Sequence, residues 1–305
     1  MAAQKTSERG MVLLLVLLVI VLLSTLLIEF SFSTLVDLRL AETFRDTARA
    51  TYLARGGVHV GQALRQEDDN GYDALDEAWA QGVPGYPVAD GTVDIAMEDL
   101  SGRIDLNRLV SSQGNIDVPV RDRYRRLLVG FGVDQPDALI ATLIDWLDAD
   151  SDLEPEGEEG GRYAAASPPY RCKNGPLDTI DELLLVQGYD SALLARLRRH
   201  VTAYGSERIN VNTASREVLM ALADEMTEPV VEAILAARQK QPFTRIEALK
   251  TLPGMETLYG FIYLYLDVRS DRFRIMATGT VNDGRRQIEA IVTRAGDRVL
   301  YQRVL

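Results

Sequence analysis

The apolar residues of this chain are concentrated near its N-terminus. Residues 11–28 form a run of 18 residues without a charge, which as a helix covers roughly 27 Å at about 1.5 Å per residue, enough for a thin hydrocarbon core. No proline interrupts residues 11–66. The pattern predicts one long helix that begins within a bilayer and continues far out of it, because apolar residues then recur along one helix face at Val36, Leu40, Phe44 and Ala48.

Three short segments alternate apolar and polar residues with a period of two, which is typical of half-buried strands. They lie at residues 93–97, 273–277 and 288–292, and Asn282-Asp283-Gly284 between the last two is a signal for a hairpin turn. We further expect a loop over residues 67–91, a second strand at 103–106 after a turn at Ser101-Gly102, and a last strand at 299–304 after Gly296-Asp297.

The segment between these two sets of strands has the spacing of helices. Apolar residues mark helix faces within residues 139–147, 183–186, 193–197, 218–222, 230–235 and 246–252. The chain is therefore expected to have an α+β fold, in which a long N-terminal helix packs on an antiparallel sheet and a large α-helical domain is inserted between the strands.

The charge of the chain limits its partners. The net charge is −12, so a phosphate backbone would be repelled unless a local basic patch opposed the field. The densest basic group, at Arg196, Arg198 and Arg199, is surrounded by acidic residues in the sequence. Lys5 and Arg9 precede the apolar run, so the positive-inside rule puts the N-terminus in the cytoplasm and the rest of the chain outside.

The sequence shows no constellation typical of catalysis. The patterns G-x-S-x-G and H-E-x-x-H and the P-loop are absent. The only histidines, His59 and His200, are expected on different parts of the fold, and the single cysteine, Cys172, is expected to be a small packing residue. We therefore expect a structural protein and not an enzyme.

An acidic segment follows the helix expected at residues 139–147. Seven carboxylates and no basic residue lie from Asp148 to Glu159, and so many like charges repel one another unless a cation compensates them. The D-x-D-x-D spacing matches an EF-hand loop, although Leu153 stands where that loop requires glycine. We expect an irregular calcium loop, with a solvated acidic loop as the alternative. The candidate ligands are Asp148, Asp150, Asp152, Glu156 and Glu159.

Residues 209–255 resemble the helix-hairpin-helix modules of DNA-uptake proteins. Residues 212–215 form a helix cap, and Leu252-Pro253-Gly254 supplies a hairpin-like turn. Such modules bind DNA because a glycine-rich hairpin presents backbone N–H groups to phosphate, whereas the first hairpin here contains Asp224 and Glu225. We expect a helical scaffold that binds no nucleic acid.

The first fifteen residues resemble the leader of type IV pilins and of type II secretion pseudopilins, in which a short basic leader ends in glycine before an apolar run. The resemblance implies cleavage by a prepilin peptidase between Gly10 and Met11, with Met11 as the methylated first residue of the mature chain. Most members carry glutamate at the fifth mature position. Here that position is Leu15, as in the minor pseudopilin K family, and a leucine cannot neutralise the terminal ammonium of a neighbouring subunit in an apolar core.

The resemblance to the pseudopilin K family extends over the whole chain. It implies a SAM-like, helix-hairpin-helix-like insertion that binds calcium in an acidic loop, and Gly157, Glu158, Glu159, Gly160 and Tyr163 match that loop in part. It further implies a non-enzymatic tip subunit of the type II secretion pseudopilus. Its partners would be the minor pseudopilins I and J, the major pseudopilin filament and the prepilin peptidase, with no small-molecule substrate.

These expectations divide the chain into five parts. They are a leader at 1–10, the N-terminal helix at 11–66, the first part of a pilin-like α/β domain at 67–110, an inserted helical domain with the calcium loop at 111–266, and C-terminal strands at 267–305. The expected location is the bacterial inner membrane, with one span and the globular part in the periplasm. The alternatives are a minor tip subunit of a type IV or DNA-uptake pilus, and a membrane-tethered periplasmic enzyme.

Overall fold

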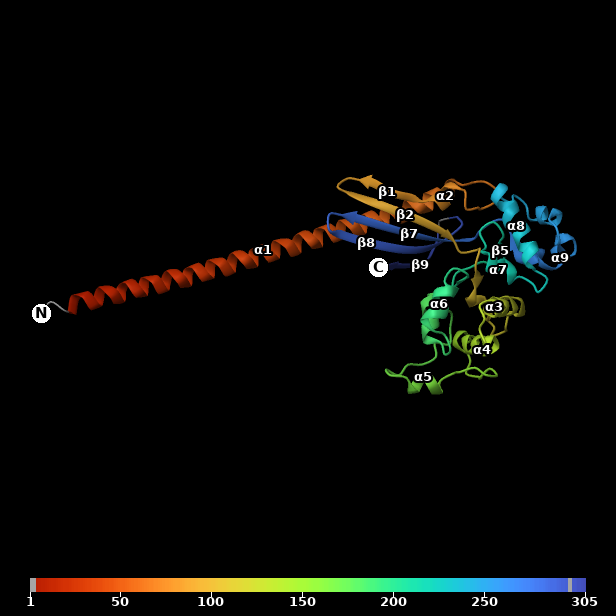
Figure 1. The fold of residues 1–305 in the computed structure, drawn as a ribbon, viewed down its shortest axis with the longest axis horizontal. Coiled ribbons are helices and arrows are strands. Elements are labelled where there is room, and N and C mark those ends of the chain that lie inside the picture. Colours follow the sequence, from red (N-terminus) through yellow and green to blue (C-terminus); the bar gives the residue numbers. More distant parts are fainter. Residues whose placement is uncertain (1–3, 296–297) are drawn as a thin grey trace.

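The computed structural model describes residues 4–295 and 298–305 of the chain. Figure 1 shows a long helix whose C-terminal part lies on a five-stranded sheet, and a mostly helical segment at the end of the sheet that is remote from the N-terminus. The α+β fold expected from the sequence is thereby confirmed. Residues 1–3 of the expected leader and the turn expected at Gly296-Asp297 lie outside the described residues.

The long helix α1 spans Gln4–Glu67, which at about 1.5 Å per residue corresponds to roughly 95 Å. From Gly10 to Arg45 its residues are almost all exposed, including Val36, Leu40 and Phe44, whose spacing indicated the helix. From Asp46 onward one face packs on the sheet. The buried positions step by four residues, at Asp46, Ala50, Ala54 and Val58, so α1 joins the globular part only through its last third.

Small residues allow α1 to approach the sheet closely. A Cβ on Gly57 would lie 2.8 Å from Val93 Cγ2 and 2.9 Å from Ala277 Cβ, which is closer than real Cβ atoms approach their neighbours. A Cβ on Gly279 would likewise collide with the backbone oxygen of Ala50. Gly57 therefore lies within α1 and lets the helix contact the sheet closely.

The sheet is antiparallel and has the order β1-β2-β7-β8-β9. The expected hairpin at residues 282–284 is confirmed, because Val281 pairs with Gly284 and Asn282 has a positive φ of 48°. The expected loop at 67–91 was wrong in part, since it contains α2 and β1. The strands are β1 (Val83–Val88), β2 (Gly91–Asp99), β7 (Arg272–Val281), β8 (Gly284–Thr293) and β9 (Val299–Val304), and α2 is Ala78–Gln81.

The segment between β2 and β7 is helical, with two pairs of very short parallel strands. The strand expected at 103–106 is β3, but it pairs with β4 in this segment and does not join the main sheet. The elements are β3 (Ile104–Asp105), η1 (Leu106–Arg108), α3 (Val118–Gly130), α4 (Pro136–Leu147), α5 (Gly161–Ala165), η2 (Ile180–Leu185), α6 (Ser191–Leu197), β4 (Val201–Thr202), β5 (Ile209–Asn210), α7 (Arg216–Met220), α8 (Glu228–Lys240), η3 (Ile246–Thr251), α9 (Met255–Ile262), η4 (Tyr263–Tyr265) and β6 (Leu266–Asp267).

The helical segment consists of two repeats of one unit. Each begins with a short strand, β3 or β5, and ends with its parallel partner, β4 or β6. Asn107 in the first repeat accepts a hydrogen bond from Leu177 N at 2.7 Å and donates to Leu177 O at 2.9 Å. Asn212 in the second repeat makes the same two bonds with Phe243, both at 2.9 Å.

A glycine turn precedes α6 in the first repeat and α9 in the second. Gly188 before α6 and Gly254 before α9 both have positive φ, 88° and 81°, and each follows a 3-10 helix, η2 or η3. Glycine suits these turns because it adopts positive φ without steric cost. Leu252-Pro253-Gly254, expected as a hairpin-like turn, is the second of these turns.

Candidate metal centre

The acidic segment is an insertion in the first repeat. In the second repeat, α8 ends at Lys240 and only residues 241–242 lie before Phe243, which bonds to Asn212. In the first repeat, α4 ends at Leu147 and residues 148–176 lie before the equivalent Leu177. The repeat therefore folds without such a loop, so the loop has a role other than forming the fold of the repeat.

The loop is held against the end of α4 by specific contacts. The Glu154 backbone N–H donates to Asp145 Oδ1 at 3.0 Å, and Gly175 N donates to Trp146 O at 3.2 Å. A side chain at position 157 would collide with the Asp145 carboxylate, so Gly157 permits this close approach. The Cys172 thiol donates to Asp145 O at 3.3 Å, and burial raises the pKa of this thiol to about 11.

Aromatic side chains close the base of the loop. Trp146 is 2% exposed and lies edge-on to Tyr163 and Tyr170, with ring centroids 5.4 and 6.4 Å away. The Tyr170 hydroxyl also donates to Leu185 O at 2.8 Å. Trp146 is thus a core aromatic residue at the C-terminal end of α4, and it packs beneath the loop.

Three of the five candidate ligands meet in this loop. One carboxylate oxygen from each of Asp148, Asp150 and Glu159 lies within 4.8 Å of the others. Asp148 is buried, Glu159 is half-buried and Asp150 is exposed, so the group has one side open to solvent. Asp152 and Glu156 are exposed and lie outside this group, and Asp152 instead donates its backbone N–H to Asp150 Oδ1 at 2.9 Å.

The carboxylates in this loop have unsatisfied oxygen atoms. Asp148 Oδ1, Glu159 Oε1 and Asp145 Oδ2 are buried and accept no hydrogen bond from the described residues. Burial, together with the charges of Asp150 and Glu159, raises the pKa of Asp148 to about 6. Burial and neighbouring carboxylates likewise raise the pKa values of Asp145 and Glu159. A hard cation with oxygen ligands would remove both the repulsion and the unsatisfied acceptors.

Asp145 is the residue that sequence analysis did not select. It is 0% exposed and lies one helical turn before Asp148, so both carboxylates face the same side of the end of α4. The sequence contains a signal for it, since D-W-L-D places two aspartates three residues apart. That signal was hidden because Asp145 precedes the EF-hand-like spacing that starts at Asp148.

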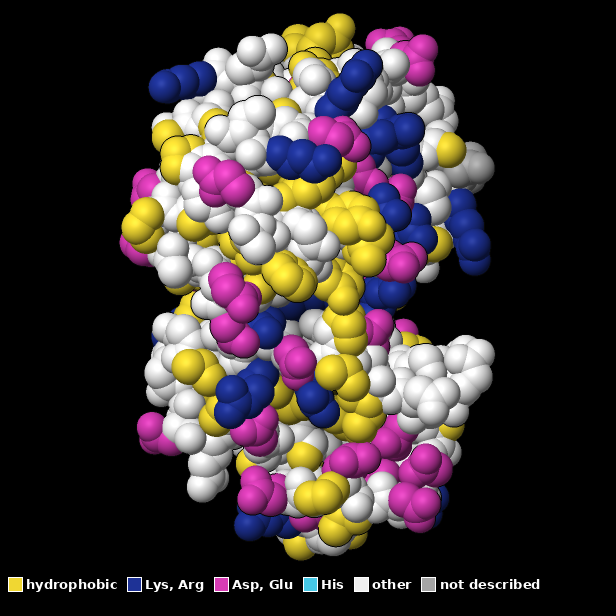
Figure 2. Space-filling view, turned by 90° about the vertical axis from the view of Figure 1, so that its right-hand side faces the viewer, with side chains coloured by type: hydrophobic (Ala, Val, Ile, Leu, Met, Phe, Trp, Pro, Cys, Tyr) yellow, Lys and Arg dark blue, Asp and Glu magenta, His cyan; other side chains and the backbone are white. Residues whose placement is uncertain are grey.

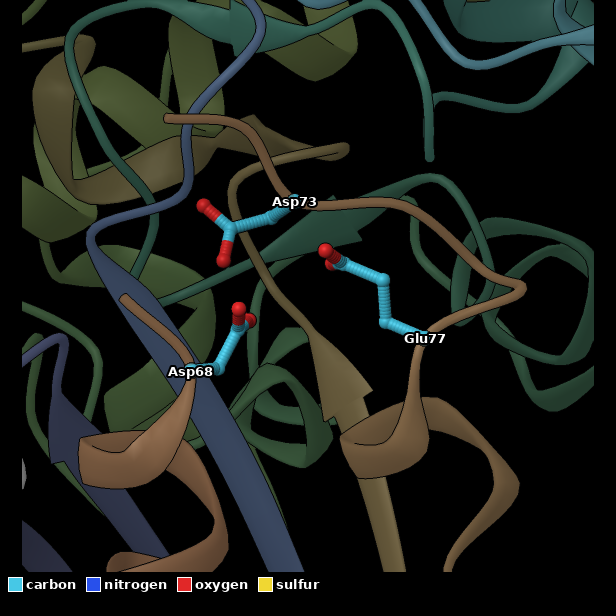
Figure 3. Close-up of side chains that lie close together, drawn as sticks. All are labelled: Asp68, Asp73 and Glu77. Atoms are coloured by element: carbon cyan, nitrogen blue, oxygen red, sulfur yellow. The ribbon is translucent and has the colours of Figure 1, made fainter. Parts of the chain in front are cut away.

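A second carboxylate group lies between the end of α1 and β1. Figure 3 shows Asp68, Asp73 and Glu77 converging from one connecting segment. Basic groups occupy this site already, because Arg65 pairs with Asp68 and with Asp73 at 3.0 Å, and Arg294 also pairs with Asp73. Glu77 accepts from Ala74 N and Trp79 Nε1 at 2.7 and 2.8 Å. The protein itself therefore supplies positive charge to Asp68 and Asp73, although Asp73 Oδ1 accepts no hydrogen bond from the described residues.

The helix-hairpin-helix-like region packs against the first repeat. The expected cap of α7 is present, with Ser215 Oγ accepting from Val218 N at 3.2 Å. Asp224 in the first hairpin is paired with Arg126 of α3 at 2.6 Å, so this hairpin contacts the first repeat. His200 lies 2.7 Å from Ser215 Oγ through its Nδ1, whereas His59 is exposed on α1, and the two histidines therefore do not form a pair.

From Gln4 onward, the expected leader and span lie in α1. Gly10, Met11 and Leu15 are all exposed, Met11 to 70% and Leu15 to 61%. Among the described residues, α1 is the one helix long and apolar enough to cross a membrane, and its best 18-residue window has a mean hydropathy of 3.4 with none of it buried. The apolar surface of this window has no partner within the described chain.

Comparison with known proteins identifies the family. Two family models, both described as type II secretion system protein K, match residues 102–206 and 209–268. The chain belongs to the type II secretion system protein K family. The matches coincide with the two repeats. Similar relatives are the type II secretion system protein K of Klebsiella pneumoniae, 29% identical over 95% of this chain and 93% of the relative, and that of Pseudomonas aeruginosa, 28% identical over 96% and 91%.

The fold is shared with a solved structure. A chain of the crystal structure of the GspK-GspI-GspJ complex from the enterotoxigenic Escherichia coli type II secretion system superposes with a TM-score of 0.69. The match covers 89% of this chain and 99% of that chain at 22% sequence identity, and it shows that the two have the same fold. This protein K family member is therefore a minor pseudopilin with a single N-terminal membrane anchor.

Proposed function

We propose that this protein K family member is the tip subunit of the type II secretion pseudopilus, where it caps the filament together with the minor pseudopilins I and J and aids protein export across the outer membrane. The observation that carries this proposal is the position of the large helical segment between β2 and β7. The segment between β2 and β7 lies beyond the end of the sheet that is remote from the membrane anchor (Figure 1). Neighbours above such a subunit would collide with it, whereas none is present at a tip.

Leu15 supports the same position. In an apolar filament core, an unpaired terminal ammonium group costs several kcal/mol, and a glutamate of the next subunit is what neutralises it. Leu15 offers no carboxylate. This subunit therefore suits a position in which no neighbouring subunit needs it to neutralise a terminal ammonium group. The resemblance of the leader also supports cleavage at Gly10–Met11, methylation of Met11 and a cytoplasmic N-terminus.

The partners I and J are supported by the solved relative, which is part of a complex of GspK with GspI and GspJ. On this chain the surface available to such partners includes the outer face of α1. Phe44 and Tyr52 are 78% and 69% exposed there, beside the half-buried Ala48. Two large, exposed aromatic residues on one face of a helix are suited to packing against the helices of neighbouring subunits.

The acidic loop fits a calcium ion. Asp148, Asp150 and Glu159 supply three converging oxygen ligands, and Asp145 lies behind them with an unsatisfied buried oxygen. All are hard ligands of the type that calcium prefers. The ion would supply positive charge that holds residues 148–176 in one conformation. Asp148 and Glu159 would bind it from the buried side, and Asp150 from the open side. Asp152 and Glu156 would have to move inward to bind the same ion, since they lie outside the group.

The test of the tip assignment uses the full chain. It is co-expressed with the minor pseudopilins I and J and a prepilin peptidase, extracted in mild detergent, and weighed by light scattering. We expect one defined assembly that contains this chain once, with a mature N-terminus at Met11. Filaments made of this chain alone, or the absence of any joint assembly, would contradict the assignment.

The proposal includes no catalytic role. The histidines are separate. Among the described residues, the groups of three carboxylates that converge are the one in the acidic loop and the one paired with Arg65 and Arg294. Asp224 argues against DNA binding by the helix-hairpin-helix-like region, because a carboxylate occupies the hairpin that would face a phosphate.

A further inference from the structure

The two edges of the main sheet differ in their protection. The edge strand β1 contains Pro84 and Pro87, has Gly85 at a positive φ of 56°, and pairs with β2 through an irregular register between Val83 and Tyr86. Prolines and bulges of this kind prevent further strands from pairing with an edge. The opposite edge strand, β9, spans Val299–Val304 and contains no proline and no glycine.

The free edge of β9 has unpaired backbone groups in a regular order. Leu305 and Gln287 exchange both backbone hydrogen bonds, at 2.8 and 3.4 Å. In an antiparallel ladder such pairs alternate with pairs that exchange none, so the backbone groups of Gln302 and Val304 point away from β8. Both residues are exposed, and no hydrogen bond from another described segment reaches their backbone. The edge therefore presents a N–H and a C=O at each of two alternate residues.

One face beside this edge is also uncovered. Val304 pairs with Ile288, and Gln302 pairs with Ala290, so these side chains lie on the same face as the core under α1. Ile288 and Ala290 are fully buried there, whereas Val304 is 53% exposed because α1 does not extend over β9. A strand added to β9 would continue the sheet beside α1 and cover Val304.

The hairpin that carries this edge has a charge opposite to that of the whole chain. Residues 284–305 contain five arginines against Glu289 and Asp297, while the net charge of the chain is −12. Arg285 and Arg286 lie next to one end of β9, and Arg298 precedes the other end. All three are exposed, and none is in an ion pair with another described residue. An acidic segment would complement both ends of the edge.

We propose that the free edge of β9 binds an extended, acidic strand of another pseudopilin subunit, which adds to the sheet as a sixth strand through the backbone of Gln302 and Val304. This inference rests on the proposed assembly with the other minor pseudopilins, and it identifies where and how one of them is held. Main-chain hydrogen bonds supply the affinity in strand addition. Arg285, Arg286 and Arg298 select acidic partners and increase the rate of encounter at low salt.

The first experiment measures backbone hydrogen exchange at single-residue resolution in the full chain, alone and in the assembly with minor pseudopilins I and J. In the free chain, the amides of Tyr301 and Arg303 should already be protected by β8. The assembly should slow exchange at Gln302 and Val304 by at least about tenfold, as expected for newly bonded amides. Unchanged exchange at these two residues in an assembly that forms normally would overturn the inference and leave the proposed function intact.

Other outcomes are equally decisive. If no assembly forms, the proposed function is contradicted, and the inference falls with it. If hydrogen exchange at Gln302 and Val304 slows in the chain alone as its concentration rises, then a second copy of this chain binds the edge. The proposal of an acidic strand from another pseudopilin would then be wrong.

The second experiment changes the edge and leaves the ladder to β8 in place. Gln302→Pro removes an outward N–H, and Arg285→Glu combined with Arg298→Glu reverses the flanking charge. Each should weaken assembly by about tenfold or more, and the charge reversal should also abolish its salt dependence. Arg245→Glu, at an exposed arginine of the second repeat, is the matched control and should assemble normally. Normal assembly of the charge-reversed variant, which retains the backbone, would overturn the acidic partner.

Discussion

Asp105 in the first repeat and Asn210 in the second hold the same turn. Asp105 Oδ1 accepts from Asn107 N at 3.1 Å, and Asn210 Oδ1 accepts from Asn212 N at 2.9 Å. An amide oxygen therefore does the structural work of the carboxylate. Burial raises the pKa of Asp105 to about 6, against about 3.9 in an unfolded chain, which means that the folded state binds this proton more tightly.

This difference predicts a pH dependence of stability. Because the folded state binds more protons, the free energy of unfolding falls as the pH rises from about 4 to about 6. Asp105→Asn should remove that loss and stabilise the chain by the order of 2 kcal/mol at pH 7, with little effect at pH 4. Denaturant unfolding of the full chain in detergent at both pH values measures it. An equal effect at the two pH values would contradict the assignment of the shift to Asp105.

The proposed calcium site predicts different effects for two aspartates of the acidic loop. Asp148→Asn would remove the buried ligand of the proposed site and should weaken calcium binding at least about tenfold, which is about 1.4 kcal/mol. It should also stabilise the calcium-free chain, since it removes one of several repelling carboxylates. Asp152→Asn is the matched control, because Asp152 is exposed and outside the group. Isothermal titration and the calcium-dependent rise in melting temperature measure both variants. Equal losses in the two variants would show that the loop rearranges around the ion.

At the scale of elements, the contact between α1 and the sheet gives two adjacent glycines different roles. A Cβ on Gly57 would meet Val93 and Ala277, whereas a Cβ on Gly56 meets nothing within 4 Å. Gly56→Ala should stabilise the chain by up to about 1 kcal/mol, because alanine favours the helix. Gly57→Ala should instead destabilise it by about 1–3 kcal/mol through overpacking. Thermal unfolding of the two variants decides the matter, and a stabilising Gly57→Ala would show that α1 can move away from the sheet at little cost.

The elements also show what the sequence could predict. Alternation located β2, β7 and β8 because one face of each strand is buried against α1. The strand β1 was missed because Pro84, Gly85 and Pro87 resemble a loop. The two repeats could not be recognised in the sequence because their connecting segments differ greatly in length. After α4 the first repeat has residues 148–176, whereas after α8 the second repeat has only residues 241–242 at the same place. The spacing selected Asp148, Asp150 and Glu159, whose carboxylates converge in the structure, together with Asp152 and Glu156, which lie outside that group. The sequence could not separate the two sets, because the course of an irregular loop depends on contacts such as that of Gly157 with Asp145.

At the scale of the whole molecule, one polar joint connects the sheet to the inserted segment. Asn210 is 0% exposed, and its side-chain amide donates to Asp73 O at 3.0 Å and to Ser270 Oγ at 2.7 Å. Ser270 N in turn donates to Asp73 Oδ2 at 2.7 Å. Asp73 also pairs with Arg65 at the end of α1. The joint therefore links the anchor helix, the sheet and the second repeat.

This joint predicts that Asn210 fixes the direction in which the inserted segment points from the sheet. Asn210→Ala leaves buried acceptors unpaired and should cost about 2–3 kcal/mol. It should also broaden the distance between spin labels placed at the exposed Tyr86 and Phe261 in a background with Cys172→Ala. Asn107→Ala is the matched control, because its lost bonds to Leu177 lie within the first repeat. That variant should lose similar stability and keep a narrow distance distribution. A tip subunit must present its end surface in one orientation, so broadening in both variants or in neither would show that this joint does not set the orientation.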